Sequence, residues 1–191
     1  DVIELLKPHL GEIKIIQIGA YGEETIEGVD DHIPTSTLKQ SSYIIQKSLA
    51  HVGIDSVPIH IASALDKPVV GIYAHTYANT CSPLWNEKSP AITIESDRNG
   101  KKPSFSLEEY PKTINLIKPE QIAQAVFDVL NINQKIKYKT LFMGSNYTSS
   151  FVEVIPTEKT NVVAQLIDVR MDYCHNEQVL SDIMQRNKVE V

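Results

Sequence analysis

The chain has 191 residues, of which 42% are hydrophobic, so it can form one good-sized domain with a real core. Its formal charge of −6 argues against a nucleic-acid-binding protein, because neutralising phosphates requires clustered Lys and Arg. No stretch holds the roughly 18 consecutive apolar residues of a membrane span, and the first residues lack the basic and apolar regions of a signal peptide. We therefore expect a folded cytoplasmic protein without a membrane span.

The cysteines give little support for cross-linking or metal binding. Cys81 and Cys174 lie far apart in the chain and do not form a CxxC motif. This pattern predicts two reduced thiols rather than a disulfide framework or a zinc site.

Predicted helices and strands alternate along the first two thirds of the chain. Apolar residues at near-helical spacing predict a helix over residues 2–10, which Gly11 ends. A β-branched run over residues 14–18 predicts a buried strand that enters a glycine-containing loop. Residues 97–118 are expected to form a long connecting loop. The remaining patterns predict helices over 38–49, 59–65 and 119–130 and strands over 51–54, 69–74 and 91–94.

This alternation indicates a Rossmann-like α/β fold, a parallel sheet with helices on both faces. Ligands of such sheets bind at the carboxyl ends of the strands. We expect this domain to span residues 1–133 and to lack its first strand, because the chain begins in a helix.

Residues 134–191 are expected to form a basic linker and a partial second α/β module. Three lysines between residues 135 and 139 mark the linker. A strand over 162–169, a helix over 176–187 and a strand over 189–191 would follow. Such a unit is too small to bury both faces of its own sheet, and the apolar residues expected to contact a partner surface are Val162, Val163, Leu166 and Ile167.

Candidate chemistry is concentrated where the strand over 51–54 turns into the next helix. The first backbone N–H groups of a helix are unpaired and form an anion site. Asp55 can accept hydrogen bonds from hydroxyl groups, Ser56 can cap the helix or donate, and His60 lies one turn into the same helix. A carboxylate beside helix-end donors suits a nucleotide sugar. We predict that these three residues line one concave site at the carboxyl edge of the sheet.

Simpler structural roles explain the same residues equally well. Asp55 can be only a helix N-cap, and His60 can be an ordinary core histidine. Ser36 and Thr37 are caps of the helix over 38–49 in the first place, and contacts to a nucleobase in the second. Local sequence alone leaves both interpretations open.

The segment 37–85 carries a series of spaced motif residues. They are Thr37, Leu38, Gly53, Asp55, Ser56, Pro58, His60, Ala62, Ala64, Leu65, Lys67, Pro68, Val69, Val70 and Thr76. In this respect the segment resembles the C-terminal domain of the ADP-heptose:lipopolysaccharide heptosyltransferases, glycosyltransferase family 9, which have a two-domain GT-B architecture. The resemblance extends more weakly over residues 1–133, where 16–24 are similar to a strand and glycine loop and 117–120 to the start of the last helix.

The resemblance implies a donor-binding half of a glycosyltransferase that transfers a sugar from a nucleotide diphosphate to an acceptor hydroxyl. The donor-binding residues that it implies are Gly19, Ser36, Thr37, Asp55, Ser56, Val57, His60 and Thr76. It places no catalytic residue in this chain, because the acceptor site and its base belong to an N-terminal domain. It implies no cofactor and no metal, and an acceptor glycan or other hydroxyl compound as the second partner. We therefore expect this chain alone to be inactive.

The chain departs from the family pattern in three places. Val57 stands where the family has glycine, Ala74 and His75 replace Gly-Pro, and residues 97–106 replace a cysteine-containing stretch. The changes at Val57 and at Ala74 and His75 keep open a second interpretation, a non-catalytic, glycosyltransferase-like scaffold within a larger protein. A nucleotide-sugar epimerase of the same architecture is a third possibility, but it explains Asp55 and Ser56 no better.

Overall fold

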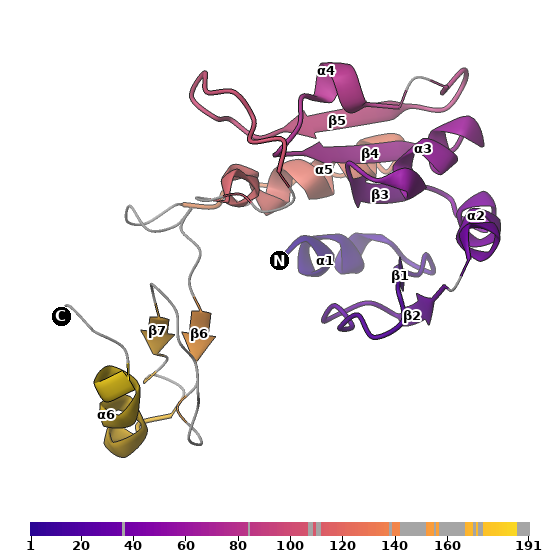
Figure 1. The fold of residues 1–191 in the computed structure, drawn as a ribbon. Helices are drawn as coiled ribbons and strands as arrows, with labels where there is room; N and C mark the ends of the chain where they lie inside the picture. Colours follow the sequence, from indigo (N-terminus) through magenta and orange to yellow (C-terminus); the bar gives the residue numbers. More distant parts are fainter. Residues whose placement is uncertain are drawn as a thin grey trace. The chain divides into compact units, whose positions relative to one another are not determined.

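A computed structural model describes most of the first 141 residues and parts of the remainder (Figure 1). The described residues are 1–35, 37–83, 85–106, 109, 112–137, 139–141, 152–154, 156, 167–169, 171 and 174–186. The chain divides into two compact units, the first formed by Asp1–Glu109 with Thr113–Tyr147 and the second by Tyr110–Lys112 with Thr148–Val191. The boundary expected after residue 133 stays a prediction.

The centre of the first unit is a parallel sheet in the order β3-β4-β5 (Figure 1). Its strands are β3 (His51–Ile54), β4 (Val69–Tyr73) and β5 (Ala91–Glu95). The middle strand β4 is buried along almost its whole length, as expected for a strand covered on both faces. All three strands lie within one residue of their predicted positions.

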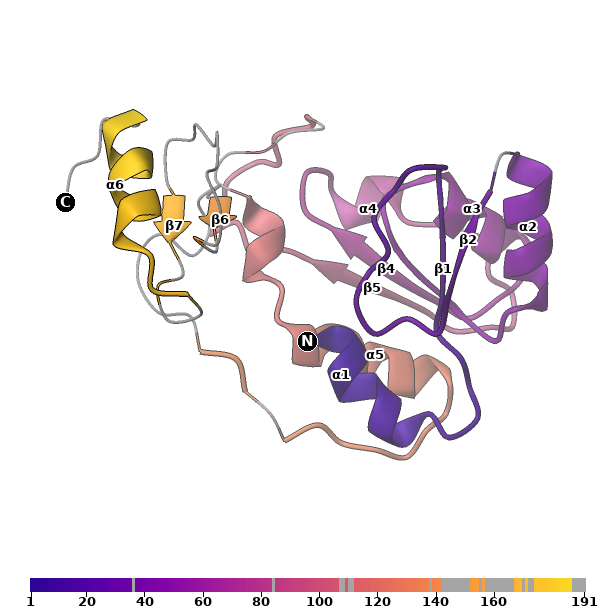
Figure 2. The same cartoon turned by 90° about the horizontal axis from the view of Figure 1, so that it is seen from below.

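Helices cover both faces of this sheet (Figure 2). Val69 packs in an apolar cluster with α3 (Val57–Ala64), whereas Val70 packs in a second cluster with α5 (Pro119–Val129). Successive residues of a strand point to opposite faces, so the two clusters lie on opposite sides of β4. The predicted Rossmann-like α/β arrangement is confirmed.

Further helices extend these two clusters. The helix α1 (Val2–Leu6) and the 3-10 turn η1 (Lys7–His9) add Leu6 and the following Leu10 to the α5 cluster. The helix α2 (Leu38–Lys47) adds its residue Ile45 to the α3 cluster. Both predicted helices are confirmed. The helix predicted over 38–49 ends two residues after α2, and the helix predicted over 2–10 ends one residue after η1.

A second, smaller parallel sheet consists of β1 (Ile16–Gly19) and β2 (Asp31–Pro34). The sequence predicted β1 two residues too early and did not predict β2. Within the described part of the chain, β1 pairs only with β2, and β3 pairs only with β4. The free side of β3 lies beside the exposed side chains of Val52 and Ile54, which are 41% and 50% exposed.

Two short elements were also not predicted. The four-residue helix α4 (Ala78–Cys81) follows β4, and the 3-10 turn η2 (Thr113–Leu116) lies within the expected loop 97–118. Cys81 and Cys174 are both free thiols, as the sequence indicated.

The first part of the expected linker lies along α5. The side chain of Gln124 accepts a hydrogen bond from the Ile136 backbone N–H at 3.1 Å. Glu120 accepts from both the backbone N–H and the hydroxyl of Thr140, at 2.8 and 2.7 Å. Ile132 and Ile136 pack against the α5 cluster. These contacts attach the segment to the first unit.

The second unit contains β6 (Val152–Val154), β7 (Ile167–Val169) and α6 (Glu177–Arg186). The two strands are parallel, and Val179 and Ile183 of α6 pack with them. The predicted helix is confirmed, and the described end of the predicted strand 162–169 is β7. Residues 189–191 and three of the expected contact residues, Val162, Val163 and Leu166, lie outside the described residues.

Candidate functional site

The carboxyl edge of the central sheet brings together two of the predicted donor-binding residues. Asp55 follows β3 directly, and Thr76 lies in the segment after β4. The Thr76 hydroxyl donates a hydrogen bond of 2.8 Å to Asp55 Oδ2. The Asp55 side chain is only 16% exposed, and it does not cap α3, whose N-cap is Ser56. The cap interpretation of Asp55 is therefore wrong.

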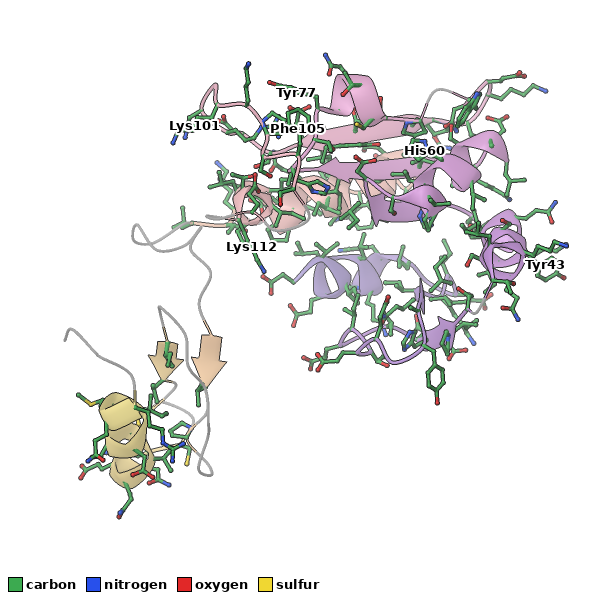
Figure 3. All side chains as sticks on the ribbon, viewed as in Figure 1. Tyr43, His60, Tyr77, Lys101, Phe105 and Lys112 are labelled. Carbon is green, nitrogen blue, oxygen red and sulfur yellow. The ribbon has the colours of Figure 1, made fainter. Side chains whose placement is uncertain are left out.

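His60 lies on the same side of the domain as Asp55. Its Nε2 is 3.9 Å from Asp55 Oδ1, close enough for an ion pair when the imidazole is protonated. The His60 side chain is 37% exposed, so it is not a core histidine (Figure 3). Its ring makes an edge contact with Trp85, with 6.2 Å between ring centroids. Asp55 and His60 therefore lie close together, whereas the concave site that they were expected to line with Ser56 stays a prediction.

The start of α3 carries no side-chain cap. Ser56 occupies the N-cap position in extended backbone, but its hydroxyl donates to the Ile54 carbonyl at 3.1 Å. Val57, the first helical residue, is 54% exposed. The positive end of the helix dipole is therefore accessible next to Asp55, which suits a bound anion.

The other predicted site residues lie around the small sheet and α2. Thr37 is the N-cap of α2 and accepts a hydrogen bond of 3.3 Å from the Gln40 backbone N–H, so its capping role is observed. Gly19 ends β1, and the Glu23 carboxylate occupies the space where a Gly19 side chain would lie. Ser36 lies outside the described residues.

A shallow hollow of about 330 Å³ lies between the end of β2 and α2. Its lining residues flank Thr37 in the sequence. The largest exposed side chain among them is Tyr43, at the outer surface of α2 (Figure 3). Its lining residues are Ile33, Pro34, Thr35, Lys39, Gln40, Tyr43 and Ile44.

A buried tyrosine lies under the Asp55 site. Burial, the Asp55 carboxylate and Cys81 together raise the pKa of Tyr73 to about 12, so its phenol stays protonated. Its ring lies over Gly71, where a side chain would collide with it. The glycine in the middle of β4 therefore makes room for the tyrosine.

A buried arginine that the sequence did not predict holds the segment that carries Thr76. The Arg98 guanidinium donates to the Ala74 carbonyl at 2.7 Å and forms an ion pair with Glu95. Glu95 in turn accepts a hydrogen bond of 2.7 Å from the backbone N–H of Ala78. Arg98 falls in the stretch predicted to be a loop. The available signal was a carboxylate at a strand end with an arginine three residues later.

The described residues offer neither a metal site nor a membrane span. In the described ranges, no group of three or more His, Cys, Asp or Glu side chains could hold a metal ion. None of the described helices is long and apolar enough to cross a membrane.

The fold and the site define an α/β protein with a carboxylate, a hydroxyl and an imidazole at the carboxyl edge of its parallel sheet. Residues 26–113 match the model of glycosyltransferase family 9 (heptosyltransferase). The family resemblance seen in the sequence is confirmed over this segment. It contains every predicted donor-binding residue except Gly19. No curated protein and no solved structure gave a significant match to the chain.

Proposed function

We propose that the first unit binds a nucleotide-diphosphate sugar, as the donor half of a heptosyltransferase-like glycosyltransferase. The observation that carries this proposal is the contact of Asp55 with Thr76 and His60 at the carboxyl edge of the sheet. This cluster lies within the segment that matches glycosyltransferase family 9. Ligands of parallel α/β sheets bind at this edge.

Each part of the cluster can recognise one part of such a donor. Asp55 Oδ2 accepts from Thr76, and Oδ1 faces His60 at 3.9 Å, so the carboxylate has lone pairs left for sugar hydroxyls. The uncapped start of α3 offers the Val57 backbone N–H and a positive dipole to the diphosphate, whereas Pro58 has no N–H and the Ile59 N–H bonds to the Ser56 carbonyl. His60 can donate a hydrogen bond to either group.

The hollow beside α2 is a candidate site for the nucleobase of the donor. Its surface is mostly apolar, and its lining residues Thr35 and Lys39 flank Thr37 in the sequence, the residue that the family resemblance assigns to the donor. Flat rings bind well to such surfaces. In this proposal the acceptor and the base that activates its hydroxyl come from a different domain, so the first unit binds the donor without catalysing transfer.

Calorimetry on the 191-residue chain with ADP-, GDP- and UDP-sugars tests the proposal. Asp55→Ala should weaken the binding of the preferred donor by about 1–3 kcal/mol, the range for an unpaired polar contact. Glu87→Ala, which removes an exposed carboxylate outside the cluster, should leave the affinity unchanged.

Two results would contradict the proposal in different ways. If none of the three nucleotide sugars binds to the wild-type chain, the donor-binding function fails and the scaffold interpretation is favoured. If one binds but Asp55→Ala leaves its affinity unchanged, the ligand site lies elsewhere on the protein.

A further inference from the structure

The segment that presents Thr76 to Asp55 is fixed at both of its ends by one pair of side chains. At its start, Arg98 donates to the Ala74 carbonyl at 2.7 Å. At its end, the Arg98 partner Glu95 accepts from the Ala78 backbone N–H at 2.7 Å. Arg98 and Glu95 therefore form a bridge that links the two ends of this segment, Ala74 and Ala78.

Burying the Arg98 side chain costs desolvation free energy, so loop stability alone does not explain this bridge. The Arg98 side chain is only 6% exposed, whereas that of Glu95 is 33% exposed. The guanidinium also lies 5.4 Å from the centre of the Tyr77 ring. Its Nε is buried and has no hydrogen-bond partner within the described residues. A buried cation with an unpaired donor costs stability relative to an apolar side chain of the same shape.

The geometry of the bridge explains why a charged side chain occupies position 98. One guanidinium can bind a carbonyl and a carboxylate at the same time, because its donors form a rigid planar fork. An apolar side chain could fill the same volume, but it could not fix the Ala74 carbonyl. Without the bridge, the segment would lose the attachments at both of its ends and would keep the bond of Thr76 to Asp55 and the 2.9 Å hydrogen bond from the Phe105 N–H to the His75 carbonyl.

We propose that Arg98 is a positioning residue for the donor site, acting through Ala74 and Glu95 to hold the Thr76 hydroxyl against Asp55. This inference rests on the proposed donor-binding function. Arg98 itself need not touch the ligand. Its role is to keep the Asp55 carboxylate oriented before the donor arrives, which lowers the cost of ordering the site on binding.

The first test compares Arg98→Met with Lys101→Met in the 191-residue chain. Arg98→Met keeps the aliphatic stem and removes the bridge, and it should weaken binding of the preferred nucleotide sugar about tenfold. Lys101 lies on the same loop at the outer surface, so its substitution removes an equal charge and should change the affinity less than about twofold (Figure 3). Arg98→Lys, which keeps the charge but loses the fork, should lie between them.

A double-mutant cycle separates positioning from general stability. In a Thr76→Val background, Arg98→Met should change donor affinity less than about twofold, because the hydroxyl that it positions is gone. An undiminished tenfold effect in that background overturns the proposal.

Hydrogen exchange provides a readout that needs no ligand. In Arg98→Met, the Ala78 amide should exchange about tenfold faster, since its acceptor Glu95 is no longer held. Unchanged protection of Ala78 overturns the proposal, whatever the binding results. If the wild-type chain binds no nucleotide sugar, the proposed function fails, and the proposal that Arg98 positions a donor site fails with it. Hydrogen exchange then decides only whether Arg98 holds the loop.

Discussion

Gly71 is the position where the core and the candidate site can be perturbed by a single methyl group. A Cβ at this residue would lie 2.8 Å from Ile59 Cδ1 and 2.8 Å from Tyr73 Cε2. Both neighbours are completely buried, so neither can move into solvent to relieve the contact. Gly71→Ala therefore tests how tightly β4 packs against α3.

The expected cost follows from two opposing effects. Adding a methyl group to a well-packed core costs about 1–3 kcal/mol, whereas replacing glycine by alanine restricts the unfolded chain and returns about 0.4–1 kcal/mol. The packing term is the larger, so Gly71→Ala should destabilise the protein by about 1–2 kcal/mol. This corresponds to a lower Tm by about 2–4 °C for each kcal/mol in a unit of this size.

Urea denaturation of the variant and of Gly19→Ala measures the effect. Gly19 also lies in a parallel strand, but a Cβ there would meet only the end of the flexible Glu23 side chain. Its substitution should be neutral or slightly stabilising. Equal stability of the wild type and Gly71→Ala would refute the packing argument, because it would mean that Ile59 and Tyr73 can move apart at no cost.

Two further predictions concern pH and proteolysis. Burial lowers the pKa of His51 to about 4, below its unfolded value of 6.5, so the unfolded state takes up the proton first. Stability should therefore fall as the pH drops from about 6.5 to 4, by up to about 3 kcal/mol, and His51→Gln should remove that part of the pH dependence in urea titrations. Trypsin should cut slowly after Lys135 and Lys137 because Gln124 and α5 hold this segment, and Gln124→Ala should speed the cleavage. Rapid cleavage of the wild-type chain there would instead support the domain boundary at residue 133.

Elements with strong local signals could be predicted from the sequence to within two residues. Thr37 caps α2 and Pro119 begins α5, and both helices have an apolar side that the spacing reveals. The strands β3, β4 and β5 are short apolar runs between turn residues. These elements depend mainly on their own residues, so the local sequence is enough to predict them.

The missed elements depend on contacts between distant parts of the chain. β2 contains Asp31 and Pro34, which disfavour strands, and it exists because β1 pairs with it. Arg98 lies in a polar stretch that indicates a loop, and only the fold shows that its side chain is buried under Tyr77. The contact of Asp55 with His60 was predicted because both lie at the start of one helix. The contact with Thr76 depends on sheet order.

Among the described strands, none pairs with one side of β3, and this edge matters for handling and engineering the protein. A strand with unpaired N–H and C=O groups beside exposed apolar side chains is a template onto which another strand can add, and natural proteins often block such edges with charged residues. Val52 and Ile54 provide no such block. This edge is therefore the first place to introduce a lysine against aggregation, and Val52 is the safer position because Ile54 adjoins Asp55.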